Sequence, residues 1–471
     1  MKFHRTHCKD AYPQDTADLM PHLPELSRRR LLKLLGATGG IGAASSLLAP
    51  LSALAQTTTG TDYKALVCLF MYGGNDANNM LVPIDAAEYA VYQRGRSNLA
   101  LPQANLLPIA PSNTGGQLFG LHPAMTGLAQ IFTAGKAAMV ANVGPLMVPT
   151  TKTQWSTRSV PLPSGLFSHS DQQDAWQSAI YDNAGRSGWG GRFMERLAPP
   201  GSANRGYSCI SLAGGNLWET GDQSLVAYKV SSSGTLGFDF FNPTGTDPLS
   251  LAINETLADQ RSHLFHQAWL QTMGRSIEVQ KVLSDALKGA TVQTVFPNTG
   301  LANQLRTVAR FISARQGLGL NRQVFFVSIG GFDTHGDDQL QQQNRLLGEI
   351  SAAVSAFYQS TVDMGVADNV TLFSASDFGR TLASNGQGSD HGWGSHHFVV
   401  GGGVRGGQLY GRYPNLTVGG PDDTGTGRWI PGLATDQMAA TLARWFGADT
   451  SVLNAVLPRL QNFTPDIGFM A

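Results

Sequence analysis

Short apolar runs alternate along the chain with longer amphipathic stretches. The continuously apolar runs are residues 65–71, 137–144, 208–214, 323–331, 369–377 and 398–403. Runs of this kind are typical of strands that helices cover on both faces of a sheet. Between them, residues 300–317, 338–365 and 435–447 repeat their apolar positions with the period of a helix, and 247–289 is a long helical stretch with one or two breaks.

This alternation predicts the fold class. Strands that alternate with helices indicate a three-layer α/β/α sandwich around a mostly parallel sheet. We expect residues 56–471 to form a single domain, because no internal repeat or linker divides them. The polar, turn-rich segment 215–248 is expected to be an excursion on the surface of that domain.

The first 55 residues have the pattern of a targeting segment. Ser27–Lys33 places arginines and a lysine before an apolar, small-residue run that ends in Ala53-Leu54-Ala55. The pair Arg28-Arg29 resembles a twin-arginine export signal, and the last three residues fit a cleavage site. We expect cleavage, the export machinery as a partner, and a periplasmic or secreted mature chain; an uncleaved membrane anchor is the alternative.

Composition narrows the class of partner. The chain has 33 Lys+Arg and 33 Asp+Glu, so its formal net charge is +0, and nothing favours a nucleic-acid partner. After the leader, no apolar run is long enough to span a bilayer, so we expect no stable membrane insertion. Only Cys68 and Cys209 remain there, and their spacing does not decide whether they pair.

Reactive side chains follow the predicted strands, where ligands bind in open α/β sheets. Asp76 follows the first strand, Asp333 and His335 follow the run 323–331, and Asp377 and Arg380 follow the run 369–377. The stretch "SDHGWGSHHF" then adds Asp390, His391, His396 and His397, and is too rich in glycine to be expected as a helix or packed strand. The segment "FSHSDQQDAW" adds Ser168, His169 and Ser170 at the start of a helix.

Each of these motifs also has an ordinary structural explanation. "GGND" at Asp76 is a common turn, "SHSDQQ" is a helix N-cap with an acidic first turn, and "DTH" is a plausible strand exit. Their combination favours a divalent metal site, because Asp and His are the usual ligands and a site for two ions needs about six of them. A hydrogen-bonded structural network is the alternative.

Four stretches taken in order resemble the motifs of the DUF1501 family. They are "LFMYGGNDANNMLVP", "SHSDQQDAWQ", "GGFDTHGDD" and "SDFGRT…NGQGSDHGWGSHHFVVGGGVRGG". That family comprises exported bacterial proteins of undefined activity, and it is similar in fold to the alkaline phosphatase and sulfatase superfamily. The resemblance implies an exported hydrolase of phosphate or sulfate esters that uses one or two divalent ions (Zn, Mn, Mg or Ca). Its substrate would be a small molecule or a polymer.

The resemblance also implies roles for individual residues. One metal site would use Asp76 with Asp390 and His391, and the other Asp333 with His335 and His396. Two departures from the superfamily pattern are visible. Asp333 and His335 are spaced two apart rather than four, and thirteen residues, "SDFGRTLASNGQG", precede the late Asp-His pair, so Asp377 is a further candidate ligand.

The catalytic residues are implied in the same way. Ser168 is the first candidate nucleophile and Ser170 the second, since a helix N-terminus near metal ions stabilises an alkoxide. His169 is a ligand or a general acid. Arg380 either clamps an oxygen of the phosphoryl or sulfuryl group or pairs with Asp377. A non-catalytic periplasmic binding or assembly protein on the same fold is the alternative function.

Overall fold

A computed structural model describes residues 62–182, 186–198, 206–223, 225–232, 234–235, 241–258 and 263–471 of the protein. The leader with its twin-arginine motif lies outside these residues. The residues described belong to one unit that spans Thr59–Ala471. Within them, no helix combines the length and apolarity needed to cross a membrane.

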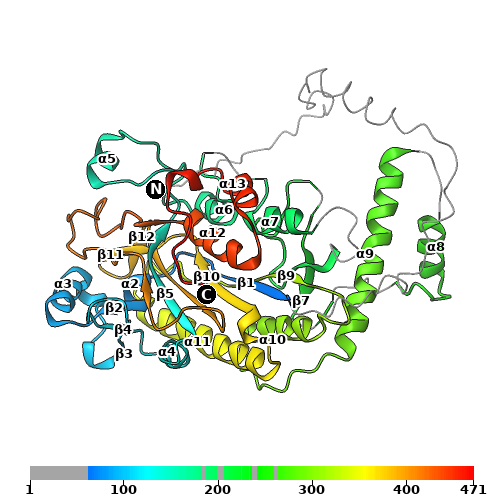
Figure 1. Ribbon diagram of the computed structural model, residues 1–471, viewed down its shortest axis with the longest axis horizontal. Helices are drawn as coiled ribbons and strands as arrows, with labels where there is room; N and C mark the ends of the chain where they lie inside the picture. The colour runs from blue at the N-terminus through cyan, green and yellow to red at the C-terminus, as the bar shows by residue number, and fades with distance from the viewer. Residues whose placement is uncertain are drawn as a thin grey trace, which may run out of the picture. The chain divides into compact units, whose positions relative to one another are not determined.

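A large, mostly parallel sheet forms the middle of the described domain (Figure 1). The strand order is β14 (Leu409–Tyr410), β5 (Ala137–Gly144), β13 (Ser395–Gly401), β10 (Val370–Ser376), β1 (Lys64–Met71), β9 (Arg322–Ile329), β6 (Cys209–Ser211), β7 (Tyr228–Ser231) and β8 (Gly234–Thr235), with β15 (Leu433–Ala434) paired to β5. The central strand β1 runs parallel to both β9 and β10. Strand β13 is antiparallel to β10 and β5.

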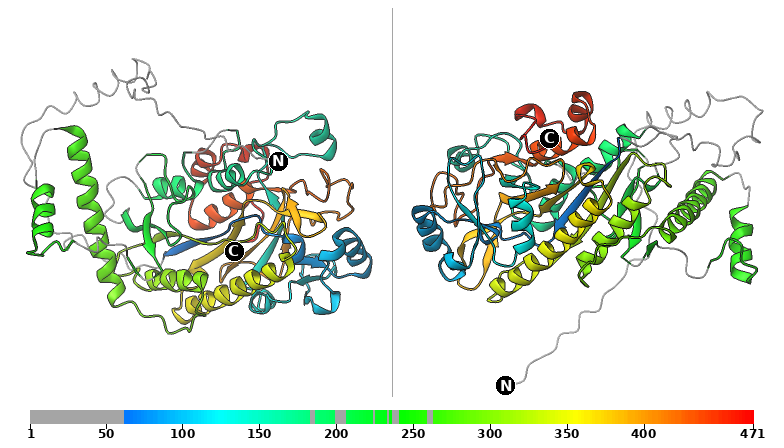
Figure 2. Two further views of the ribbon diagram at one scale, coloured as in Figure 1. Left: turned by 180° about the vertical axis from the view of Figure 1, so that it is seen from behind. Right: turned by 60° about the horizontal axis from the view of Figure 1, so that its bottom comes forward.

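Helices cover both faces of this sheet, as Figures 1 and 2 show. One layer contains α4 (Thr126–Thr133), α10 (Gly300–Ser313) and α11 (Gln339–Asp363), and the other α6 (His169–Ser178), α7 (Trp189–Leu197), α12 (Thr435–Phe446) and α13 (Thr450–Val456). Alternate residues of β1 enter two separate cores: Val67 and Leu69 pack on the α10–α11 side, Cys68 and Phe70 on the α6–α12 side. The predicted three-layer α/β sandwich is therefore confirmed.

The remaining elements surround this core. Helices α8 (Pro248–Leu257) and α9 (Leu264–Lys288) account for the predicted helical stretch with a break. Two small sheets join β2 (Leu81–Pro83), β4 (Phe119–Leu121) and β3 (Leu107–Ile109), and β11 (Arg380–Ser384) with β12 (Ser389–His391). Short helices α2 (Ala77–Met80), α3 (Ala86–Arg96) and α5 (Lys152–Thr157) lie in the connections.

Two expectations from the sequence differ from the structure. The stretch 389–398 is not a loop: it forms β12 and the first half of β13. Its glycines serve close backbone packing, since a Cβ at Gly392 would lie 2.5 Å from the Gly379 carbonyl oxygen. The segment 215–248 is not wholly a surface excursion, because β7 pairs with β6 and Trp218 is buried.

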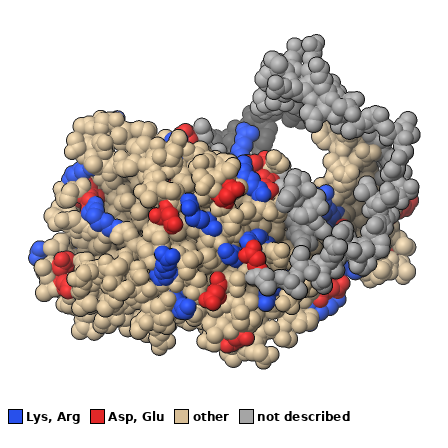
Figure 3. Space-filling view, in the orientation of Figure 1, with Lys and Arg blue, Asp and Glu red and all other residues tan. Residues whose placement is uncertain are grey.

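The described surface carries few charges. On the face shown in Figure 3, lysines, arginines and acidic residues are interspersed among a majority of uncharged residues. Inside the domain, Cys68 and Cys209 are both buried, and no disulfide joins one to the other. The fold therefore depends on its two apolar cores rather than on a disulfide between these residues.

Candidate functional site

A cluster of histidines and aspartates lies where the central parallel strands end. Asp333 comes four residues after the last residue of β9, and Asp377 directly follows β10. His169 is the first residue of α6, and His391 is the last residue of β12. Parallel strands deliver these segments to one edge of the sheet, which is where α/β folds place their ligands.

Three imidazoles converge on one carboxylate oxygen. The Nε2 atoms of His169, His335 and His391 lie 3.4, 3.0 and 3.4 Å from Asp333 Oδ1. The Nε2 atoms of His335 and His391 are 2.9 Å apart. One potential ligand atom each from His169, Asp333 and His391 falls within a 4.8 Å group.

The other ring nitrogen of each histidine faces an oxygen acceptor. His169 Nδ1 lies 2.6 Å from Asp377 Oδ2, and His335 Nδ1 lies 3.1 Å from Asp390 Oδ1. His391 Nδ1 lies 2.7 Å from the backbone carbonyl oxygen of Phe167. A carbonyl and ionised carboxylates only accept hydrogen bonds, so the tautomer with the proton on Nδ1 satisfies all three of these contacts and gives each Nε2 a lone pair.

This arrangement brings four electron-pair donors close together, namely the three Nε2 atoms and Asp333 Oδ1. In this tautomer, most pairs of these atoms have no hydrogen atom between them. His169 Nε2 is buried and has no hydrogen-bond partner in the described part of the chain. Lone pairs this close repel one another unless a cation lies between them. Two ligand atoms at bonding distance from a tetrahedral zinc ion are about 3.4 Å apart. This matches the 3.4 Å from Asp333 Oδ1 to the Nε2 atoms of His169 and His391, whereas His335 Nε2 lies closer, at 3.0 Å. Histidines whose second nitrogen is held by a carboxylate or carbonyl are typical of metal sites.

Arg380 holds Asp333 from the interior. Its buried guanidinium donates to Asp333 Oδ1 at 3.0 Å, to Gly73 O at 2.9 Å and to Ser389 O at 3.0 Å. Burial raises the pKa of Asp333, but the hydrogen bond and positive charge of Arg380 outweigh it and lower the pKa overall. Burial lowers the pKa of Arg380 itself. Arg380 pairs with Asp333 rather than Asp377, and its guanidinium is turned toward protein oxygens.

The surrounding electrostatics favour a neutral His391 and a charged Asp390. Burial lowers the pKa of His391, with a hydrogen bond to the Phe167 carbonyl acting in the opposite direction. The hydrogen bond from Asn385 lowers the pKa of Asp390. Burial raises the pKa of Asp377, against hydrogen bonds from Gln173 and His169 that lower it.

Backbone geometry fixes two of these groups. Phe167 has a φ of 72°, a left-handed conformation that is rare for a residue with a side chain, and this places its carbonyl at His391. Arg428 donates to the backbone oxygen of His391 at 2.6 Å and lies over the Phe167 ring at 4.8 Å. Gly73 has a φ of +110°, and a Cβ there would lie 2.4 Å from the Asp333 amide nitrogen.

Two of the aspartates and histidines named from the sequence have other partners. Asp76 is buried, pairs with Arg96 and accepts a hydrogen bond from Gln339 at 2.6 Å. His396 is buried in β13, accepts from the Asn142 amide at 3.1 Å and stacks on Tyr413 at 4.7 Å. Burial lowers the pKa of His396 to about 3, so it stays neutral. No interaction between described residues joins either of them to the cluster.

The two candidate nucleophiles lie beside the cluster at the start of α6. Ser168 is the N-cap residue, but its side chain makes no capping hydrogen bond. Its Oγ lies 3.4 Å from Ser170 Oγ. Its neighbour His169 shares the ligand-like geometry of His335 and His391. No sequence motif pointed to the Phe167 carbonyl, or to Gln173 and Asn385, which donate hydrogen bonds to Asp377 and Asp390.

The fold and this cluster together define a three-layer α/β protein with a histidine–carboxylate site at the edge of its sheet. The chain belongs to the family described as "Protein of unknown function (DUF1501)", whose model matches residues 63–450. No curated protein sequence matches it.

Several solved structures are distantly similar. The chain is 10% identical to Ps i-CgsB, solved with k-i-k-neocarrahexaose, with a TM-score of 0.35 over 86% of this chain and 77% of that one. It is 10% identical to the PsFucS1 sulfatase from Pseudoalteromonas sp., with a TM-score of 0.33 over 91% and 73%. The phosphonate monoester hydrolase SpPMH from Silicibacter pomeroyi is 8% identical, with a TM-score of 0.33 over 82% and 74%. Similarities this distant carry no argument about chemistry, which has to come from this chain's own residues.

Proposed function

We propose that the protein is an exported, metal-dependent hydrolase of phosphate or sulfate esters. The observation that supports this most is the convergence of three histidine Nε2 atoms on Asp333 Oδ1. In this proposal His169, His335, His391 and Asp333 hold one ion. Asp377 and Asp390 orient two of the histidines instead of binding the metal themselves.

The set of ligands favours particular ions. Three imidazole nitrogens and one carboxylate oxygen suit zinc and similar transition metals, whereas magnesium and calcium prefer sites made of oxygen. Among the ions considered from the sequence, zinc and then manganese fit best. When bound, such an ion would polarise the ester and stabilise negative charge on the reacting oxygens.

The chain's own residues supply the remaining chemistry. The cluster is open to solvent, with the Asp333 side chain 49% exposed and that of His335 42% exposed, so an ester can reach it. Ser168 Oγ attacks the phosphorus or sulfur and loses its proton, the bond to the ester oxygen breaks, and that oxygen takes up a proton and leaves as the alcohol. Water then cleaves the Ser168 ester and restores the hydroxyl group. Arg380 keeps Asp333 in place throughout.

The test is hydrolysis by the mature protein, residues 56–471, across aryl phosphates, phosphodiesters, phosphonates and sulfates. Protein stripped with a chelator should be inactive, and adding back zinc or manganese should restore turnover. Equal activity in stripped and reloaded protein would reject the proposal. Export is tested separately, by replacing Arg28-Arg29 with lysines and following the protein into the periplasm.

A second candidate function is a binding or assembly protein that uses the same cluster structurally. It is favoured by one observation: the Ser168 hydroxyl contacts that of Ser170, at 3.4 Å, rather than a base. Such a protein would bind metal but hydrolyse none of the esters above. Ester turnover, and not metal content, therefore distinguishes the two candidate functions.

A further inference from the structure

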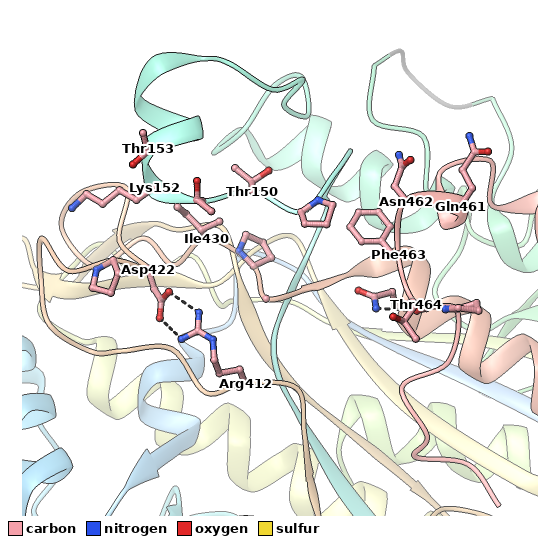
Figure 4. A pocket seen from close by; sticks show the side chains of 17 residues that line it. Thr150, Lys152, Thr153, Arg412, Asp422, Ile430, Gln461, Asn462, Phe463 and Thr464 are labelled. Carbon is pink, nitrogen blue, oxygen red and sulfur yellow. Dashed lines mark hydrogen bonds and ion pairs between the residues drawn. The ribbon is translucent and has the colours of Figure 1, made fainter.

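A wide groove lies apart from the histidine cluster. Its volume is about 1030 Å³, at the upper end of the usual range for ligand sites. Residues 149–153, parts of 421–432 and residues 461–465 form its walls, with Arg412 and Gln437 between them (Figure 4). None of the cluster residues lines it.

Two segments connect this groove to the cluster. Helix α5 lines the groove with Lys152 and Thr153, while its Trp155 packs on Phe167 at 6.1 Å, next to the carbonyl that holds His391. The segment 422–430 lines the groove with Asp422 and Ile430, and its Arg428 contacts the backbone of His391. The groove and the proposed reaction centre are therefore linked through these two segments.

Most charge in the groove is already compensated. Arg412 makes a two-pronged ion pair with Asp422, at 2.7 and 2.6 Å. Lys152 Nζ donates to the carbonyl oxygens of Gly419 and Gly420, at 2.5 and 3.0 Å. Two of its three N–H groups are used in this way, which leaves one N–H and one positive charge for a ligand.

Uncharged polar groups and small apolar surfaces make up the rest. Thr153, Gln461 and Thr464 are exposed there, and Phe463 presents a half-buried ring. Four prolines add rigid apolar walls: Pro149, Pro421, Pro431 and Pro465. Amides and hydroxyls beside an aromatic ring match a sugar, which has hydroxyls on its rim and C–H groups on its ring faces.

Other polymers fit this groove less well. Its lining contains too few cations to neutralise a run of phosphates, so a nucleic acid is disfavoured. A peptide that extends a sheet needs a free strand edge, and none of the residues that line the groove belongs to a strand. Apart from prolines, Ile430 and Phe463 are the large apolar side chains of the lining, which is too few for the apolar groove that binds a helical peptide.

We propose that this groove binds the sugar chain of an oligosaccharide ester, with Lys152 contacting an anionic group on a neighbouring sugar unit. The proposal rests on the proposed hydrolase function for its link to the cluster, but binding itself does not need the metal. Phe463 stacks on a sugar ring, and Gln461 and Thr464 bond to hydroxyls. The site thereby holds a polymeric substrate whose ester reaches the histidines.

The test is isothermal titration of the mature protein with hexasaccharides of glucose, galactose and N-acetylglucosamine, each in neutral and monosulfated form. We expect at least one backbone to bind, and its sulfated form to bind more tightly. Phe463→Ala and Gln461→Ala should each weaken binding by about fivefold, and Lys152→Met should remove only the preference for the sulfate. Phe265→Ala and Gln271→Ala, both exposed on α9, are matched controls and should change nothing.

Two outcomes would overturn the proposal: no hexasaccharide binds, or binding is unaffected by the groove variants. The same titration with His391→Ala separates this proposal from the proposed function. Sugar binding that persists in this variant, in the absence of metal and turnover, supports the sugar site in the groove independently of the hydrolase function. Turnover of small esters without any sugar binding supports the hydrolase alone.

Discussion

His335 and His391 face each other through their Nε2 atoms at 2.9 Å, although the Nδ1 atom of each ring is already directed at an oxygen acceptor. A proton shared by this pair would satisfy these two rings but would leave His169 Nε2 without a partner. One cation bound by all three rings and Asp333 satisfies the whole set. The proposal of a metal site depends on this difference between a shared proton and a bound cation.

Replacing His335 should separate ligands from the residues that orient them. His335→Ala removes a proposed ligand, so we expect metal content to fall well below one equivalent. Asp390→Asn keeps a hydrogen-bond acceptor for His335, so metal should still bind, with affinity lower by about 10- to 100-fold. Titration with a zinc-sensitive dye measures both. An Asp390→Asn protein as devoid of metal as His335→Ala would make Asp390 a ligand.

Adding a methyl group at Gly73 should displace Asp333. In Gly73→Ala the new Cβ would meet the Asp333 backbone at 2.4 Å, so the loop has to move and metal affinity should drop. We also expect unfolding to become easier by about 1–3 kcal/mol. Gly115→Ala is the control: its φ is also positive, but no atom lies within 4 Å of the added Cβ. Equal metal affinity in the two variants would contradict this role of Gly73.

Ser168→Ala should remove turnover while leaving metal content unchanged. The hydroxyl group makes no capping bond, so its loss should cost little stability, under about 1 kcal/mol. Ser170→Ala is the matched comparison, since it lies two residues further along the same helix. Steady-state rates on the best substrate of the ester screen decide. Activity that survives in Ser168→Ala but not in Ser170→Ala would move the nucleophile to Ser170.

Glu219 should make stability depend on pH. Burial raises the pKa of Glu219 from 4.5 to about 8, against a hydrogen bond from Asn216 that lowers it. Between these two pH values the folded protein keeps a proton that the unfolded chain releases. The free energy of unfolding should therefore fall as the pH rises through this window, by roughly 1–3 kcal/mol from this residue.

Denaturant melts of wild-type protein and Glu219→Gln at pH 5 and pH 8 measure this effect. The glutamine variant cannot ionise, so its free energy of unfolding should fall less between pH 5 and pH 8 than that of the wild type. Metal binding changes with pH in both proteins and cancels in the comparison. A fall in the free energy of unfolding that is as large or larger in the variant would show that Glu219 is ionised in the folded state.

Much of the fold could be read from hydrophobic patterning. Runs such as 65–71 and 369–377 are apolar at every position because helices cover both faces of the sheet, and this signal is local. The stretch 389–398 misled because its glycines look like those of a loop. They are there because the Gly379 backbone and the Asn142 side chain approach closely, and such contacts are not visible in a local pattern.

Part of the site could also be predicted from the sequence, because it depends on where the strands end. Asp333, His335 and His391 follow strands, and the rule that strand ends carry ligands brings them together. Asp76 obeys the same rule, but Arg96, which is distant from any motif, takes its carboxylate. His396 lies in a packed strand, where it is directed at the Asn142 backbone. Side-chain partners of this kind are set by tertiary packing rather than by spacing in the sequence.

The most direct test is the metal content of the purified mature protein, measured by elemental mass spectrometry beside His391→Ala. The account predicts close to one equivalent of zinc or another transition metal in the wild type and its loss in a variant that remains folded by circular dichroism. A folded wild-type protein that takes up no metal even after incubation with zinc or manganese would contradict it. The three histidines would then form a hydrogen-bonded network around Asp333.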